Sequence, residues 1–92
     1  MPSAERPSAV SPMSIGDRVI SILAGIAEAP EVEENPDLEL FDLGVLDSLK
    51  TVELMVALSE EFGVEISPAE FEREQWATPR RIVAYITSRL TA

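Results

Sequence analysis

The chain of 92 residues contains no cysteine and no histidine. Without cysteine there is no disulfide framework, no thiolate metal site and no thiol nucleophile. Without histidine the chain lacks the usual general base and the commonest zinc ligand. A domain this small buries only about two-thirds of the surface that its unfolded chain exposes, which leaves little room for a large substrate pocket. These absences argue against an enzyme that acts by itself, and we expect no metal site.

The sequence also lacks a long apolar run. No stretch approaches the length of a membrane-spanning helix, and the N-terminus lacks the apolar segment of a signal peptide. We therefore expect a soluble, cytoplasmic protein that does not insert into membranes. Residues 1–13 are rich in Pro, Ser and Ala without apolar periodicity, so they predict a disordered tail, and Met13 is an alternative first residue.

Basic residues are scarce. Seven of them stand against seventeen acids, which gives a net charge of −10. Residues 28–74 hold fifteen acids and two bases, whereas residues 75–92 hold three arginines and no acid. This charge opposes binding to nucleic acid, and the acidic middle of the chain should attract a basic partner. Because 46% of the residues are hydrophobic, we expect a folded domain and not an acidic disordered segment.

Apolar periodicity and capping residues predict four helices and no strand. The expected helices are residues 14–27, residues 48–62, a short helix beginning at Pro68, and a helix from Pro79 to the C-terminus. Ser14, Ser67 and Thr78 are the expected N-caps, and Gly63 is expected to end the second helix in the left-handed conformation. The predicted fold is therefore all-α, a small four-helix bundle with a short third helix.

A long acidic connection over residues 28–47 joins the first two helices. Its apolar residues are too many for a solvated linker, so we expect an irregular, partly 3₁₀ loop that folds back onto the core. These residues are Leu38, Leu40, Phe41, Leu43, Val45 and Leu46. Gly44 stands where the chain must turn before the second helix.

On a helical wheel, residues 48–62 form two apolar arcs. One arc is the expected core stripe, made of Thr51, Leu54, Met55, Leu58 and Phe62. The other mixes aliphatic side chains with carboxylates and consists of Leu49, Val52, Glu53, Val56 and Glu60. Since one stripe is enough to join a bundle, the second arc has the composition of a docking surface. The alternative is that the loop over residues 28–47 covers Leu49 and Val52.

Ser48 begins the second helix, directly after Asp47, and either residue could simply be the N-cap. A serine at a helix N-terminus also lies beside unpaired backbone N–H groups, where an added phosphate is well tolerated. The Asp47 carboxylate could hold a metal ion bound by a modifying enzyme. Residues 44–49 contain no His or Lys base that would make Ser48 a nucleophile. This pattern predicts a modification site.

Residues 44–49, Gly-Val-Leu-Asp-Ser-Leu, resemble the phosphopantetheine attachment motif of acyl and peptidyl carrier proteins. The expected helices and the acidic loop fit that family over roughly residues 14–90. Residues 46–54, Leu-Asp-Ser-Leu-Lys-Thr-Val-Glu-Leu, and residues 71–79, Phe-Glu-Arg-Glu-Gln-Trp-Ala-Thr-Pro, are similar to the D-alanyl carrier subgroup. Members of that subgroup accept D-alanine from an adenylating ligase and deliver it toward teichoic acids. The Pro/Ser tail and the arginine-biased composition depart from the subgroup and also fit carriers of antibiotic biosynthesis.

The resemblance implies a monomeric, free-standing carrier domain over residues 14–92 with no catalytic group of its own. A phosphopantetheinyl transferase would attach 4′-phosphopantetheine to Ser48, with Asp47 in support. An adenylating ligase would then load an aminoacyl group as a thioester, and a downstream aminoacyl or acyl transferase would receive it. The side chains expected to dock these enzymes are Leu49, Val52, Glu53, Val56 and Glu60.

Two alternatives stay open. An acyl carrier for polyketide or fatty acyl chains would use the same attachment with another cargo. A non-enzymatic acidic helical adaptor would explain the charge and the second arc but would leave the Gly-Val-Leu-Asp-Ser-Leu run to chance. A calcium-binding module is disfavoured because the acids of residues 31–47 lack the ligand spacing of a calcium loop.

Overall fold

The computed structural model describes residues 14–91, so the expected disordered tail over residues 1–13, with Met13, lies outside the described residues. The described chain is all-helical and contains no strand. Its α-helices are α1 (Ile15–Ala27), α2 (Ser48–Phe62) and α3 (Pro79–Thr91), and its 3₁₀ turns are η2 (Pro30–Glu33), η3 (Pro68–Glu70) and η4 (Arg73–Trp76). Between residues 14 and 91, no helix is long and apolar enough to cross a membrane.

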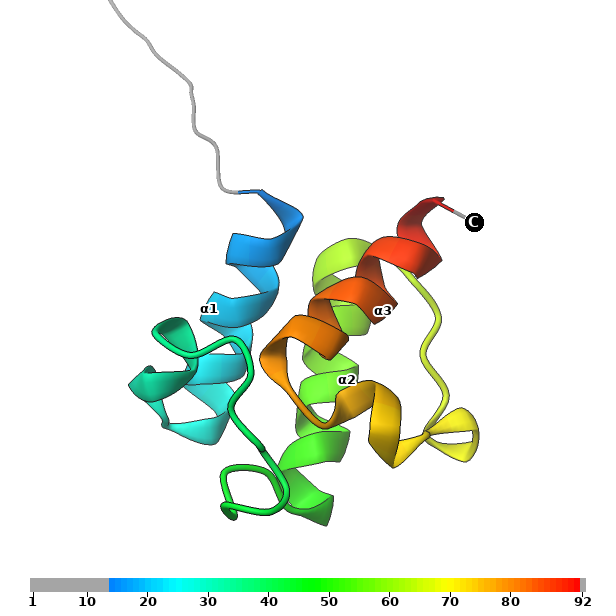
Figure 1. Cartoon of the computed structure of the whole chain (residues 1–92). Coiled ribbons are helices and arrows are strands. Elements are labelled where there is room, and N and C mark those ends of the chain that lie inside the picture. The colour runs from blue at the N-terminus through cyan, green and yellow to red at the C-terminus, as the bar shows by residue number, and fades with distance from the viewer. Residues whose placement is uncertain (1–13, 92) are drawn as a thin grey trace, which may run out of the picture.

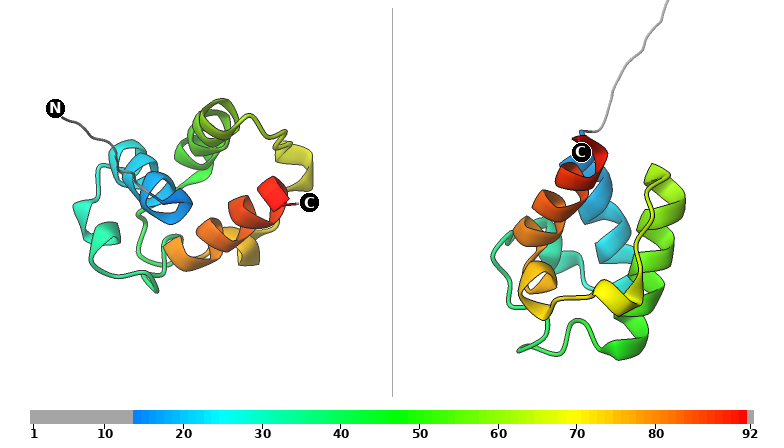
Figure 2. Two further views of the ribbon diagram at one scale, coloured as in Figure 1. Left: turned by 90° about the horizontal axis from the view of Figure 1, so that it is seen from above. Right: turned by 90° about the vertical axis from the view of Figure 1, so that its right-hand side faces the viewer.

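Helix α1 packs against both α2 and α3 (Figure 1). The view from above in Figure 2 shows the three helices grouped around a shared interior. That interior holds fully buried aliphatic side chains from each helix, among them Leu23 of α1, Leu54 and Leu58 of α2, and Ile82 and Ile86 of α3. Burial of one such side chain contributes about 1.5–3 kcal/mol, so this shared core is the main source of stability.

Local signals set the ends of the α-helices. Ser14 Oγ accepts the N–H of Asp17 at 3.2 Å, and Thr78 Oγ1 accepts the N–H of Arg81 at 3.2 Å, which confirms these two predicted N-caps. The third, Ser67, is also confirmed, because its Oγ accepts the N–H of Ala69 at 3.2 Å at the start of η3. Gly63 ends α2 with a φ of 67°. Glycine adopts this left-handed conformation without a steric cost, and the predicted end of the helix is therefore confirmed.

Four aromatic rings connect the loop after η2 to α3. The ring centroids of Phe41 and Phe71 are 6.0 Å apart, those of Phe71 and Trp76 are 6.3 Å apart, and those of Trp76 and Tyr85 are 5.3 Å apart. Trp76 is almost fully buried at the centre of this row. Aromatic pairs at these separations add to the stabilisation that comes from burial alone.

The residues expected to form a short third helix are not α-helical. The turns η3 and η4 occur there, separated by extended backbone at Phe71 and Glu72, with ψ angles of 131° and 118°. Phe71 and Trp76 both face the aromatic row, whereas residues five apart on an α-helix point roughly 140° away from one another. The aromatic contacts therefore favour two short turns over one continuous helix.

The loop over residues 28–47 folds back onto the core with one exception. Leu40 and Leu46 are buried, and Leu38, Phe41 and Val45 are half-buried, but Leu43 is 63% exposed, so its expected place in the core was wrong. The N–H of Leu46 donates to the Leu40 carbonyl at 3.0 Å, which closes a turn with Leu43 at its tip. Gly44 follows with a φ of 74°.

An exposed ion pair joins the same loop to the start of α3. Arg80 donates from Nε to Asp37 Oδ1 at 2.9 Å and from Nη2 to Oδ2 at 3.1 Å, and its backbone N–H donates to the Pro36 carbonyl at 2.9 Å. The hydrogen bonds and the positive charge of Arg80 hold the pKa of Asp37 below its ordinary value. The pair fixes the loop against α3 at the surface.

Candidate functional site

The start of α2 resolves the choice between the two candidate N-caps. Asp47 has extended backbone, and its Oδ1 accepts the N–H of Lys50 at 2.8 Å. Its backbone carbonyl accepts the N–H of Thr51 at 2.9 Å, which is the first hydrogen bond of the helix. Asp47 is therefore the N-cap, and Ser48 is the first helical residue, exposed to solvent.

This position has a definite electrostatic character. The first four backbone N–H groups of a helix have no carbonyl partner within the helix itself, and they carry its partial positive charge. Asp47 Oδ1 accepts one of these groups, the N–H of Lys50, and the N–H of Thr51 is the first to bond a carbonyl of the helix. The N–H groups of Ser48 and Leu49 also belong to the first four and lie directly beside the Ser48 side chain. A phosphate on the Ser48 hydroxyl would thus stand at the positive end of α2.

Two contacts hold the start of α2 in place. The Thr51 hydroxyl donates to the Asp47 carbonyl at 2.6 Å. Lys50 Nζ donates to the carbonyl of Ala27, the last residue of α1, at 3.3 Å. A cation at the C-terminal end of a helix is also favoured by the helix dipole. Ser48 is therefore presented from a fixed helix end, although it is itself exposed.

The two arcs of α2 have opposite environments. In the predicted core stripe, Thr51, Leu54, Met55 and Leu58 are buried, and Phe62 is half-buried beneath the guanidinium of Arg18 at 4.6 Å. In the other arc every member is exposed, and the apolar ones reach 68% at Leu49, 43% at Val52 and 51% at Val56. The alternative that the loop covers Leu49 and Val52 was therefore wrong. Glu53 and Glu60 give the uncovered arc its negative charge.

A groove of about 420 Å³ lies beside Ser48. It is bounded by one side of α2, by the loop that precedes it, and by the segment from η3 to η4. Its lining residues are Phe41, Leu46, Asp47, Ser48, Thr51, Val52, Met55, Pro68, Phe71 and Arg73. Sequence reasoning missed this groove because its walls come from three separate segments. The run over residues 71–79 marked the D-alanyl subgroup, but nothing local in it indicated a position near Ser48.

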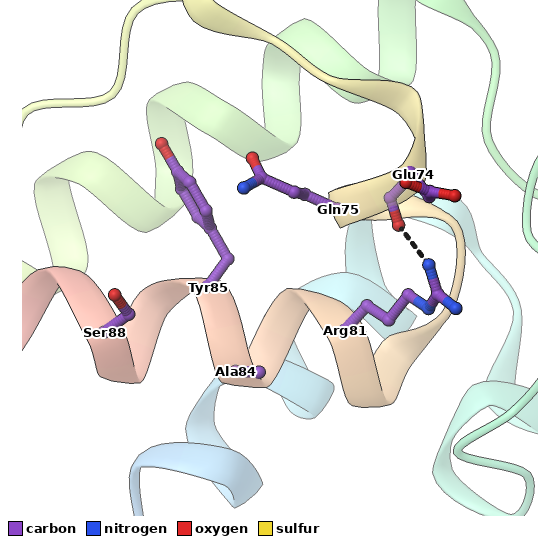
Figure 3. Close-up of a pocket in the computed structure, with 6 residues that line it drawn as sticks. All are labelled: Glu74, Gln75, Arg81, Ala84, Tyr85 and Ser88. Carbon is purple, nitrogen blue, oxygen red and sulfur yellow. Dashed lines mark hydrogen bonds between the residues drawn. The ribbon is translucent and has the colours of Figure 1, made fainter.

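A second hollow of about 400 Å³ lies between η4 and α3, and none of its lining residues belongs to α2. Tyr85 and Gln75 extend into it side by side, and Arg81 donates to the backbone carbonyl of Glu74 at 3.1 Å (Figure 3). Within residues 14–91, no group of three or more His, Cys, Asp or Glu side chains is placed to hold a metal ion. The candidate site is therefore the start of α2 with its adjoining arc and groove.

An exposed serine at a helix start, next to an uncovered apolar face, can serve a protein that carries a covalent group for other proteins. The family described as "Phosphopantetheine attachment site" matches residues 17–86. The chain belongs to this family of carrier proteins, and its prosthetic group is covalently attached 4′-phosphopantetheine. Carrier proteins of this kind receive the group from a phosphopantetheinyl transferase.

Two relatives match the chain over most of its length. A D-alanyl carrier protein of Staphylococcus saprophyticus subsp. saprophyticus is 40% identical over 74 residues, which are 80% of this chain and 95% of that protein. A D-alanyl carrier protein of Bacillus velezensis is 43% identical over 75 residues, which are 82% of this chain and 96% of that protein. The resemblance to this family and subgroup, stated from the sequence, is thus confirmed.

Proposed function

We propose that Ser48 is the attachment residue for 4′-phosphopantetheine. The observation that carries this proposal is the position of Ser48, exposed as the first residue of α2 while Asp47 takes the capping role. The Ser48 hydroxyl oxygen forms the new bond to the phosphorus of coenzyme A that carries pantetheine, the pyrophosphate bond of coenzyme A breaks, and adenosine 3′,5′-bisphosphate leaves. The proton of the hydroxyl passes to the transferase. When bound, the group supplies a thiol for a thioester, which this chain lacks because it has no cysteine. The second carboxylate oxygen of Asp47 is available to a metal ion of the transferase.

The carrier domain in this proposal spans residues 14–92 and acts as a monomer with no catalytic group of its own. We assign it the four-helix bundle of carrier proteins, with η3 and η4 in the place of the short third helix. Its contribution to the reaction is to raise the effective concentration of a tethered group at each partner enzyme. Because the arm comes from coenzyme A and loading uses an adenylating enzyme, we place the carrier in the cytoplasm.

The exposed arc of α2 is the proposed docking face for the partner enzymes. The apolar part of this face extends along one side of the helix for about two turns and would fit an apolar hollow on the partner. It consists of Leu49, Val52 and Val56. Glu53 and Glu60 on the same arc favour a partner with a basic rim, because charge complementarity speeds encounter and fixes orientation. A face this small supports brief contacts, which suit a carrier that must visit several enzymes in turn.

We propose D-alanine as the cargo, loaded by an adenylating ligase and passed to a downstream transferase. The support comes from the two D-alanyl carrier proteins, which align with this chain over at least 95% of their own length. The experiment incubates the phosphopantetheinylated chain with ATP, D-alanine and the ligase of one of those two organisms. A hydroxylamine-labile mass gain of one alanyl group is expected, and Ser48→Ala should show none.

The same experiment tests the rival cargoes. L-Alanine with the same ligase, and octanoate with an acyl ligase, should load far less of the chain than D-alanine does. Efficient loading of octanoate alone would contradict the aminoacyl proposal and favour an acyl carrier. If the chain could not be modified at Ser48 at all, the adaptor interpretation would replace the carrier proposal.

A further inference from the structure

The groove beside Ser48 contains one cation among its lining residues, and this is Arg73. Arg73 is the first residue of η4, it lines the groove, and its side chain is 65% exposed. Its guanidinium carbon lies 4.8 Å from the centroid of the Phe41 ring. Stacking on that ring limits the positions of the guanidinium. The stacking itself uses none of the hydrogen-bond donors of the guanidinium.

Arg73 has one weak ionic partner. Its Nη2 lies 3.3 Å from Asp42 Oδ1, and the Asp42 side chain is 69% exposed. An exposed ion pair at this distance adds little to the stability of the fold and is screened by salt. An anion that binds the guanidinium more strongly can therefore displace the Asp42 carboxylate. A phosphate group offers such an anion, because the guanidinium fork can donate two parallel hydrogen bonds to its oxygens.

The surrounding charge explains why Arg73 is the residue expected to bind such an anion. Residues 28–74 hold fifteen acids and only two bases, Lys50 and Arg73. Lys50 Nζ donates to the Ala27 carbonyl, and Lys50 is not a lining residue of the groove. An anion beside Ser48 would therefore meet the negative charge of Asp47 on one side, and among the residues that line the groove only Arg73 can offset it.

We propose that Arg73 binds the phosphodiester of the arm on Ser48 and exchanges Asp42 for it. This inference rests on the proposed attachment at Ser48. The contact aims the arm from the end of α2 into the groove, toward Met55 and Phe71. Val52 is the one member of the docking arc that lines this groove. Arg73 is a positioning residue in this arrangement, because it binds the tether and not the reacting thioester.

The first test follows arginine side chains in the ¹⁵N-labelled wild-type chain before and after phosphopantetheinylation, with completeness checked by intact mass. The Nε–Hε resonance of Arg73 should shift on modification, and raising the salt to 0.5 M should return it toward its position in the unmodified chain. Arg81 is the internal control, because its guanidinium is bonded to the Glu74 carbonyl in the other hollow (Figure 3). An Arg73 resonance that moves no more than that of Arg81 overturns the inference.

The second test observes the phosphodiester itself by ³¹P NMR. Arg73→Gln should shift the ³¹P resonance of the modified chain, Arg73→Lys should shift it less, and the matched control Arg81→Gln should leave it at the wild-type position. Equal ³¹P positions in Arg73→Gln and Arg81→Gln contradict the contact. Failure of the wild-type chain to gain the arm at Ser48 would overturn the proposed attachment and this inference together. Modification with an unmoved Arg73 would overturn the inference alone.

Discussion

The two arcs of α2 are built from similar aliphatic side chains, yet they lie in opposite environments. Leu54 and Leu58 on one arc are completely buried, whereas Leu49 and Val56 on the other expose more than half of their surface. Hydrophobicity alone therefore does not separate the core residues from the proposed docking residues in this helix. The separation comes from position on the wheel and from the carboxylates that interrupt the exposed arc. Changes on one arc should alter stability, and changes on the other should alter loading.

The largest effect is expected on the buried arc. Leu54→Ala removes a fully buried side chain and leaves a cavity among α1, α2 and α3, so unfolding should require about 2–5 kcal/mol less free energy. Urea denaturation followed by circular dichroism measures this loss. At a temperature where the variant stays folded, its rate of phosphopantetheinylation should stay near that of the wild type. A folded Leu54→Ala chain that fails to accept the arm would mean that the arcs are not separable.

A smaller effect, on loading and not mainly on stability, is expected from Val56→Asp on the exposed arc. The free energy of unfolding should change by about 1 kcal/mol or less, because Val56 is 51% exposed and the new carboxylate would share a helix face with Glu53 and Glu60. The kcat/KM of D-alanyl loading should fall about tenfold, since a charge enters the proposed apolar contact. Leu90→Asp is the matched control on α3, where Leu90 is 36% exposed. Equal loading of Val56→Asp and wild type would place the docking face elsewhere.

Glu53→Arg tests the charged part of the same arc and should have a weaker effect. Loading should slow on the order of a few-fold at low salt, because reversal of a rim charge mainly lowers the association rate. The difference from wild type should vanish near 1 M salt, where the screening length is about 3 Å. Glu33→Arg in η2 makes the same change of net charge away from α2. If both variants slow loading equally, net charge and not the arc attracts the partner.

The smallest effect is expected at an exposed contact outside both arcs. Asp37 has a pKa below its ordinary value of 3.8, because Arg80 donates hydrogen bonds to its carboxylate and its positive charge lies close by. The carboxylate therefore stabilises the fold above that ordinary value, and this contribution is lost as pH falls through the lowered pKa of the folded state. Thermal melts should show a small advantage of wild type over Asp37→Asn at pH 6 that disappears at strongly acidic pH. Arg80→Gln should remove the same advantage, and a difference that persists at acidic pH would assign it to another cause.

The sequence predicted the parts of this molecule that depend on neighbours within one helix. Ser14, Thr78 and Gly63 mark helix ends through bonds or backbone conformations a few residues away, and the wheel of residues 48–62 separates the arcs without any tertiary information. The family followed from residues 44–49, which are contiguous. Local physics was sufficient in each of these cases.

The remaining features depend on contacts between distant segments. Leu43 is exposed because the bond between Leu46 and Leu40 turns the loop around it. The expected third helix is replaced by two turns because Phe71 packs against Phe41, thirty positions earlier. The groove and the ion pair between Arg73 and Asp42 also depend on contacts between segments that are distant in the sequence. The spacing of residues within either segment does not indicate these contacts.

Attachment of the prosthetic group to Ser48, at the capped start of α2, is the proposal on which the loading predictions depend. Intact mass spectrometry tests it most directly, on wild type and Ser48→Ala after incubation with coenzyme A and a broad-specificity phosphopantetheinyl transferase. We expect a single added phosphopantetheine on the wild-type chain and an unchanged mass for Ser48→Ala, with the same helical circular dichroism for both. An equal mass gain on Ser48→Ala, or none on the folded wild-type chain, would contradict it.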